Sequence, residues 1–254
     1  MKITCWSDYA CPYCYIGEVR LKWVIANVPE LGEVELEMIA FHLDPDAGEH
    51  ATGDTQTRFA QKYGLTMEHA GRSVEHISQM GWAEGLDFHY AETQFTNTMD
   101  THRLTKLAQS KGDPALAQRV VDALFHAYFG ESKELADKAL LREIGVSCGL
   151  DGEEVKRLLE SDLYRDEVIL DEGEAARYGI HNDSEERRLG FRSTSEMRPN
   201  VDDQAMPLTA FQVQGGGYIY YQLRDLGKAL GFNVGWSAGR GIFIETDKPD
   251  SDAD

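Results

Sequence analysis

Two cysteines near the beginning of the chain, Cys11 and Cys14, have the C-x-x-C spacing that disulfide frameworks, zinc sites and redox centres share. Four cysteines in 254 residues are too few for a disulfide scaffold, which is far denser in small secreted domains. A structural zinc ion takes four ligands, usually from two pairs, and the sequence has no second C-x-x-C or H-x-x-x-H pair. The spacing and its context therefore favour a redox centre without a metal.

The residues around the two cysteines predict a division of labour between them. Pro12 suits the first position of a helix, because the N–H that it lacks would have no partner there. Cys11 would then lie beside unpaired backbone N–H groups and the positive end of the helix dipole, which favour a thiolate. We expect Cys14 to be the more enclosed thiol, and Tyr13, between them, to be exposed. The pattern predicts Cys11 as the nucleophile and Cys14 as the resolving thiol.

The first 45 residues predict a strand, a helix and a second strand. Residues 2–7 read as a short strand, and apolar residues recur at helical spacing from about 12 to 27. Residues 33–41 alternate apolar side chains with glutamates, as a half-buried strand does. This order is typical of a βαβ unit with parallel strands.

From about residue 46 to residue 177 the sequence predicts helices and no convincing strand. The apolar spacing is helical in three stretches: 116–129, 133–150 and 151–164. Gly149 suits the C-cap of one helix and Asp151 the N-cap of the next. Strand periodicity returns at 206–223, where two apolar runs flank a glycine-rich turn, followed by a short helix. Two halves split in this way predict a small mixed sheet covered by helices.

Composition and charge exclude several classes of partner. The formal net charge of −19 disfavours nucleic acid and anionic membranes, which repel an acidic surface. No apolar run approaches the roughly 20 residues that cross a bilayer. The first residues lack the apolar region of a signal peptide, so we expect a cytoplasmic protein.

Four stretches resemble a known family: SDYACPYCYIGEVRL at 7–21, NTMDTHRLTKLA at 97–108, LFHAYF at 124–129 and GVSCGLD at 145–151. They are similar to the DsbA-like oxidoreductases, and among these to the FrnE-like subgroup. That subgroup is related to the 2-hydroxychromene-2-carboxylate isomerases and the kappa-class glutathione transferases. The resemblance implies an α/β, thioredoxin-like fold with a large all-helical insertion. Its parts are a first half, the insertion, a second half and a flexible acidic tail: 1–45, 46–177, 178–245 and 246–254.

The resemblance also implies a substrate site made by Pro12 and Tyr13 together with Met206 and Pro207. The Met206–Pro207 bond would be the family's cis-proline, which places an unpaired backbone edge beside the cysteines. An ordinary trans proline that opens a strand is the alternative. The chain departs from its relatives in the charged segment 181–205 and in having Ala205–Met206 where glycine–valine is usual, which leaves the choice of partner open.

Three polar residues have two interpretations each. Asp8, three residues before Cys11, either acts on the motif through its charge or as a proton acceptor, or caps the turn. Asn97 and His102 match positions that face the active-site cleft in the isomerase relatives. The alternatives are a helix cap for Asn97 and a packed imidazole for His102.

The sequence favours a cytoplasmic thiol–disulfide oxidoreductase that needs no metal and no bound organic cofactor. Its partners would be protein or low-molecular-weight thiols and disulfides, with glutathione included because glutaredoxins share the C-P-Y-C motif. In a reducing cytosol the resting form is the dithiol, which favours disulfide reduction or oxidative-stress defence.

Two other functions stay open. A glutathione-dependent isomerase or transferase is the first, although those relatives typically carry serine in place of Cys11. A non-enzymatic, chaperone-like binding module is the second. The sequence does not determine the substrate or the oligomeric state.

Overall fold

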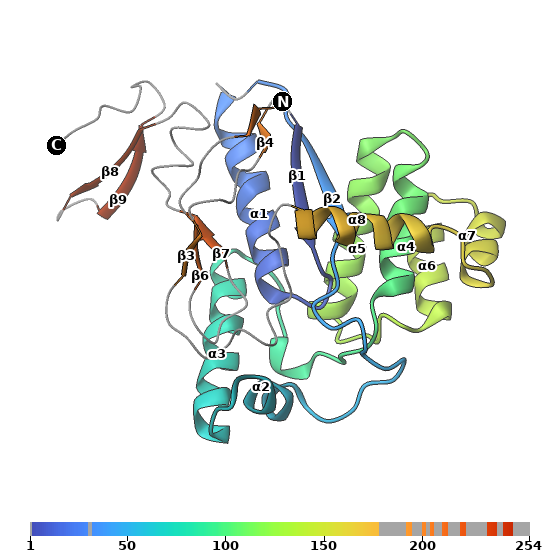
Figure 1. Ribbon diagram of the computed structural model, residues 1–254, viewed down its shortest axis with the longest axis horizontal. Helices are drawn as coiled ribbons and strands as arrows, with labels where there is room; N and C mark the ends of the chain where they lie inside the picture. The colour runs from blue at the N-terminus through green and yellow to red at the C-terminus, as the bar shows by residue number, and fades with distance from the viewer. Residues whose placement is uncertain are drawn as a thin grey trace. The chain divides into compact units, whose positions relative to one another are not determined.

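The computed structural model describes residues 2–29 and 32–177, and after residue 177 the backbone of the strands β3 to β9 (Figure 1). Several predictions fall on other residues of the segment 178–254. The Met206–Pro207 bond, the helix after the hairpin and the acidic tail all lie outside the described residues.

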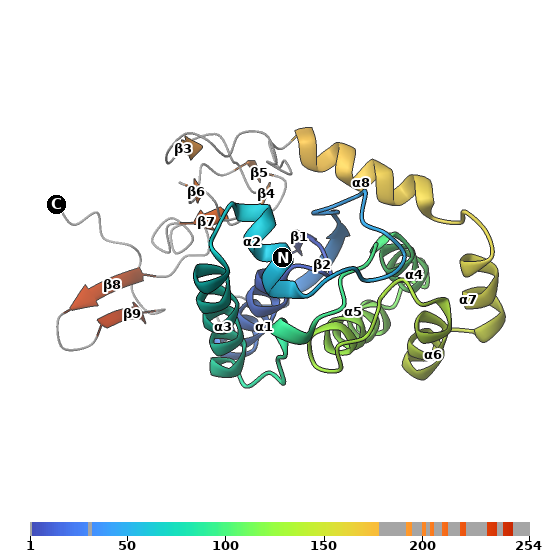
Figure 2. The same cartoon turned by 90° about the horizontal axis from the view of Figure 1, so that it is seen from below.

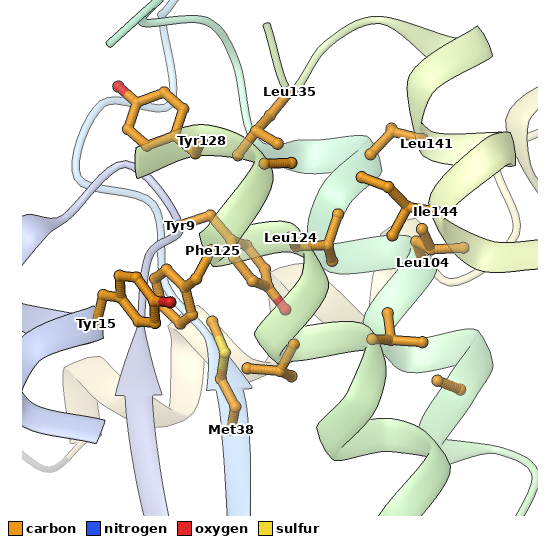
Figure 3. Packing of buried hydrophobic residues seen from close by; sticks show 14 of the residues in the cluster. Tyr9, Tyr15, Met38, Leu104, Leu124, Phe125, Tyr128, Leu135, Leu141 and Ile144 are labelled. Carbon is orange, nitrogen blue, oxygen red and sulfur yellow. The ribbon is translucent and has the colours of Figure 1, made fainter. Parts of the chain in front are cut away.

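The predicted strand, helix and strand are present as β1 (Lys2–Ser7), α1 (Pro12–Asn27) and β2 (Glu35–Ala40). β1 and β2 form a two-stranded sheet, and their arrows point the same way (Figure 3). The carboxyl ends of the two strands therefore meet at one edge, where the N–H of Phe41 donates to the carbonyl of Ser7 (3.2 Å). The βαβ order is confirmed, with β2 shorter than the expected 33–41.

Helices make up the regular structure between residues 46 and 177, as the sequence predicts. They are α2 (Thr55–Tyr63), α3 (Met67–Ala83), the 3₁₀ turn η2 (Tyr90–Glu92), α4 (Met99–Gln109), α5 (Pro114–Phe129), α6 (Lys138–Cys148), α7 (Gly152–Leu159) and α8 (Arg165–Arg177). No strand occurs in this part of the chain. Figure 2 shows α4 and α5 side by side, and α6 and α7 pack against this pair.

The helix caps that the sequence predicts are present in α6 and α7. Asp151 accepts hydrogen bonds from the N–H groups of Glu153 and Glu154 and so caps α7 (both 3.0 Å). Gly149 ends α6 with φ +107°, a conformation that L side chains rarely adopt. The helix expected over 133–150 begins only at Lys138, because Asp137 caps it there.

Aromatic rings fill the core beside α1. Tyr15, which directly follows Cys14, stacks on Phe125 with centroids 4.8 Å apart, and Phe125 also contacts Tyr9 (Figure 3). Phe88 and Phe129 stack on each other at 4.7 Å. Aliphatic side chains from α4 to α7 continue this core, so the first turn of α1 rests on the helical segment.

Two buried or half-buried polar groups attach helices to distant segments. The Arg103 guanidinium donates to the carbonyls of Leu158, Ser161 and Leu163 and thereby joins α4 to the end of α7. Asp171 on α8 accepts the N–H of Ala40 (3.0 Å), so α8 is bonded to β2. These bonds satisfy backbone groups that the helices and the strand edge leave unpaired.

The second half of the chain contains the predicted hairpin. β6 (Ala210–Gln212) pairs antiparallel with β7 (Ile219–Tyr221), and β3 (Arg192–Thr194) pairs with β6. The remaining strands pair in two further hairpins: β4 (Asn200–Val201) with β5 (Gln204–Ala205), and β8 (Asn233–Ser237) with β9 (Gly241–Glu245). All four of these pairings are antiparallel, and the joining of strands from both halves into one mixed sheet stays a prediction.

The chain divides into two compact units. One consists of Thr4–Leu21 and Glu37–Ala176; the other consists of Met1–Ile3, Lys22–Leu36 and Arg177–Asp254. The division into the four predicted parts, with boundaries at 45, 177 and 245, stays a prediction. None of the described helices is long and apolar enough to span a bilayer.

Gly81 tests how tightly α3 packs on the core. A Cβ at this position would lie 2.4 Å from Cγ of the buried Phe88, so we expect Gly81→Ala to destabilise the protein by about 1–3 kcal/mol through overpacking. Gly173 on α8 has no atom within 4 Å of such a Cβ. Gly173→Ala should stabilise by about 0.5–1 kcal/mol, and urea unfolding compares the two variants. Equal unfolding midpoints would contradict this packing.

Candidate functional site

The two cysteines lie at the beginning of α1, as the sequence predicts. Cys11 is the residue before the helix, and its carbonyl accepts the N–H groups of Cys14 (3.2 Å) and Tyr15 (3.4 Å). The N–H of Cys11 donates to the carbonyl of Asp8 (3.1 Å), which closes a tight turn between β1 and α1. Both cysteines are free thiols in this structure.

The exposure of the motif differs from the sequence prediction. Cys11 is 6% exposed, whereas Cys14 is half-buried, so the expectation that Cys14 is the more enclosed thiol is wrong. Tyr13 is also half-buried instead of exposed, because its side chain packs against the hydrophobic core. The physical reason is that the turn from residue 7 to residue 12 is buried as a whole.

The two thiols differ in acidity because they are hydrogen-bonded to each other. A hydrogen bond with Cys14, together with burial, raises the pKa of the Cys11 thiol well above its ordinary value. The same hydrogen bond, opposed by burial and supported by the Ser7 hydroxyl, lowers the pKa of Cys14. In this arrangement the proton lies on Cys11 and the first negative charge on Cys14. This is the reverse of the charge distribution that the position of Cys11 at the helix start predicts. The titration is a property of the hydrogen-bonded pair of thiols.

Asp8 is 2% exposed and is fully engaged in hydrogen bonds. Its carboxylate accepts the N–H of Leu43 (2.7 Å), the N–H of Ala10 (3.2 Å) and the hydroxyl of Thr98 (2.9 Å). Burial opposes its ionisation, but the His102 imidazole and the N–H of Leu43 hold the pKa of Asp8 below its ordinary value. Its charge raises the pKa of both thiols. Asp8 therefore caps the turn, and its charge opposes a thiolate in the motif.

His102 is a packed imidazole that lies beside Asp8. Its Nε2 is 3.7 Å from Oδ1 of Asp8, and its ring contacts those of Tyr9 and His42 at 5.1 and 4.8 Å between centroids. Burial lowers the pKa of His102 in spite of the carboxylate. The ring is therefore neutral at pH 7.

Two residues that the sequence analysis did not select complete this cluster. His42 directly follows β2, is 3% exposed, and has Nδ1 2.6 Å from Oε1 of Glu172 on α8. Burial opposes the ionisation of Glu172, but the His42 contact lowers its pKa. No local pattern could identify this pair, because 130 residues separate its members in the chain.

Asn97 caps a helix, which was the alternative interpretation of this residue. Its side-chain oxygen accepts the N–H of Met99 at the beginning of α4 (2.8 Å), and its amide donates to the carbonyl of Pro45 (3.2 Å). Pro12 is buried under the motif, and Met206 and Pro207 lie outside the described residues. Among the described residues no group of three histidine, cysteine or acidic side chains could hold a metal ion.

Comparison with known proteins identifies the family. The profile described as "DSBA-like thioredoxin domain" matches residues 2–181. The chain belongs to this family. The fold is therefore the DsbA-like thioredoxin fold with its helical insertion, and the DsbA-like members are oxidoreductases that act on thiols.

Individual relatives agree with this family. A probable DsbA oxidoreductase from Streptomyces coelicolor, SCO1869, is 34% identical, with a TM-score of 0.65 over 70% of this chain and 76% of that chain. The uncharacterised protein YwbO of Bacillus subtilis is 25% identical over 65% of this chain and 74% of its own length. A putative protein disulfide isomerase from Nitrosomonas europaea is 12% identical (TM-score 0.51), covers 90% of this chain and 95% of its own, and shows the fold alone.

Replacing Asp8 tests its electrostatic effect on this DsbA-like site. Because its negative charge raises the pKa of both thiols, Asp8→Asn should lower the pH at which thiolate appears, followed by absorbance at 240 nm. The exposed Glu174 on α8 supplies a control with the same change of charge, and Glu174→Gln should leave this titration unchanged. A thiolate that appears at the same or higher pH in Asp8→Asn would show that the charge has no such effect.

Proposed function

We propose that the protein is a cytoplasmic thiol–disulfide oxidoreductase that exchanges disulfides through Cys11 and Cys14. The observation that carries the proposal is a pair of free thiols at the beginning of α1 that are hydrogen-bonded to each other. Such a pair holds one sulfur ready for attack and the other ready to resolve the product.

The proposed reaction proceeds through a mixed disulfide. The Cys11 sulfur attacks one sulfur of a substrate disulfide, and the other substrate sulfur leaves as a thiolate that takes a proton. Cys14 then attacks Cys11, which forms the Cys11–Cys14 disulfide and releases the second substrate thiol. Two electrons pass from the cysteine pair to the substrate. Because the pKa of Cys11 is raised and that of Cys14 is lowered, the Cys11 proton moves to the Cys14 sulfur before the first attack.

Pro12, Tyr13, Met206 and Pro207 are proposed to bind the substrate. Pro12 and Tyr13 belong to the first turn of α1, next to both sulfurs. The cis form of Met206–Pro207 and its place beside the cysteines stay predictions. A reducing cytosol would hold the enzyme as the dithiol, which directs the exchange toward reduction of oxidised thiols, as in defence against oxidative stress.

Serine substitutions test the roles of the two sulfurs. Cys11→Ser should abolish dithiothreitol-dependent reduction of insulin, whereas Cys14→Ser should accumulate mixed disulfides that mass spectrometry detects at Cys11. The reason is that only the resolving thiol can release a bound substrate. Trapping of mixed disulfides in Cys11→Ser instead would reverse the assignment and leave the proposed exchange intact.

Arg58 favours a small anionic thiol such as glutathione among the partners. Its guanidinium lies 3.4 Å from the centre of the Phe95 ring, and none of the described carboxylates is within salt-bridge distance of it. Asp44 acts on it only at longer range. Tyr90 and Tyr128 lie close enough to both Arg58 and Cys11 for each group's charge to act on them. In a chain with a net charge of −19, this cation can receive a substrate carboxylate near the reactive sulfur.

The Arg58→Gln variant tests whether activity depends on the negative charge of the substrate. It should lower kcat/KM for glutathione about fivefold, since a partly buried charge pair contributes about 1 kcal/mol. Dithiothreitol-dependent insulin reduction should not change. Arg72 on α3 is the matched control, because it already pairs with Glu68 on the exposed face of α3. An equal loss with glutathione and dithiothreitol, or the same loss in Arg72→Gln, would exclude a carboxylate site at Arg58.

A further inference from the structure

Asp8, His102, His42 and Glu172 form a continuous buried array beside the cysteine motif. Asp8 is attached to the motif by its backbone, since its carbonyl accepts the N–H of Cys11 (3.1 Å). Nε2 of His102 lies 3.7 Å from Oδ1 of Asp8, and the His42 ring packs edge-on against the His102 ring. Nδ1 of His42 lies 2.6 Å from Oε1 of Glu172. The Glu172 side chain is 29% exposed, so the array runs from the motif to the solvent.

The members come from four different segments, which packing alone brings together. Asp8 lies in the turn between β1 and α1, His42 follows β2, His102 is on α4 and Glu172 is on α8. Two buried imidazoles are not needed to satisfy Asp8, because three hydrogen-bond donors already contact its carboxylate. Nε2 of His102 has no hydrogen-bond partner in the described structure, although it is fully buried. Leaving a buried polar atom without a hydrogen bond destabilises the folded protein, unless the atom gains a partner in another protonation state of the site.

Thiolate formation creates such a state. A thiolate in the motif places a second negative charge near the ionised Asp8, in a buried site where like charges repel strongly. No described lysine or arginine lies within salt-bridge distance of Asp8. His102 is the nearest group to Asp8 that can become a cation, and its neutral Nε2 can accept a proton.

Resting on the proposed function, we propose that His102 takes up a proton when the Cys11–Cys14 pair forms its thiolate, so that an imidazolium beside Asp8 offsets the new charge. The step is balanced, because the thiol loses one proton and His102 gains one. The resulting imidazolium donates from Nε2 to Oδ1 of Asp8. No electron moves in this step, and the net charge of the buried site is unchanged.

Other charged groups around His102 fit this assignment. Tyr9 contacts the ring from the β1–α1 turn, but its phenol is hydrogen-bonded to Thr105 and burial raises the pKa of this phenol. His42 disfavours a cation at His102, whereas the Glu172 carboxylate favours one. Lys106 on the same helix is paired with Asp171 at 2.5 Å. With the carboxylates of Asp8 and Glu172 nearby, His102 is thus the group whose proton affinity rises most when the thiolate forms.

The experiment compares the titration of His102 in two redox states. NMR of histidine-labelled wild-type protein follows each imidazole from pH 4 to pH 9, as the disulfide and as the dithiol, with His102→Gln to assign the signal. We expect the His102 midpoint to lie about one pH unit higher in the dithiol, a tenfold gain in proton affinity. The exposed His76 on α3 should titrate identically in both states, and His76→Gln assigns its signal.

A second readout uses the thiols themselves. In His102→Gln the thiolate absorbance at 240 nm should appear at higher pH than in the wild type, since no imidazolium offsets it. The same His102 midpoint in both redox states would overturn the inference. If the pair exchanges no disulfide with insulin or glutathione while the His102 midpoint still shifts, the proposed function fails and the proton uptake stands.

Discussion

The buried carboxylate of Asp8 is the constraint on which the rest of the site depends. It joins three segments, because it accepts hydrogen bonds from Ala10 in the motif turn, Leu43 after β2 and Thr98 before α4. An ionised carboxylate inside a protein costs several kcal/mol unless such donors surround it. The turn, the strand edge and the start of α4 must therefore keep their positions together, and this fixes where Cys11 lies.

The same carboxylate opposes the helix that activates the cysteines. The beginning of α1 favours a thiolate, whereas Asp8 disfavours one, so the thiols experience two effects of opposite sign. Hydrogen bonding between the sulfurs then decides where the proton lies. A site balanced in this way responds to small changes of charge nearby, which gives His102 and its partners a chemical role beyond packing.

The helical segment fixes the positions of the groups that set the protonation of the thiols. Tyr15 stacks on Phe125, which fixes the first turn of α1 against α5. Arg103 joins α4 to the end of α7, and Asp171 bonds α8 to β2, so His102 and Glu172 reach the motif from fixed helices. The helical segment is thus part of the candidate site, because half of the buried array belongs to it.

The sequence by itself determined the features that depend on neighbours along the chain. The position of Pro12 predicts the beginning of α1, Asp151 and Gly149 predict a cap on either side of one short loop, and the C-x-x-C spacing predicts a redox pair. Alternation and helical spacing predict the strand–helix–strand order and the following helices, since these patterns report local backbone geometry.

Only the tertiary structure decided which of the two sulfurs is enclosed and which groups surround them. Cys11 is buried and Tyr13 half-buried because the whole turn packs against the core, which no spacing in the motif reveals. His42 and Glu172 meet across 130 residues, and their contact exists because α8 is bonded to β2. Burial and long-range contacts are properties of the packed chain, so the protonation of the site follows from packing and not from local sequence.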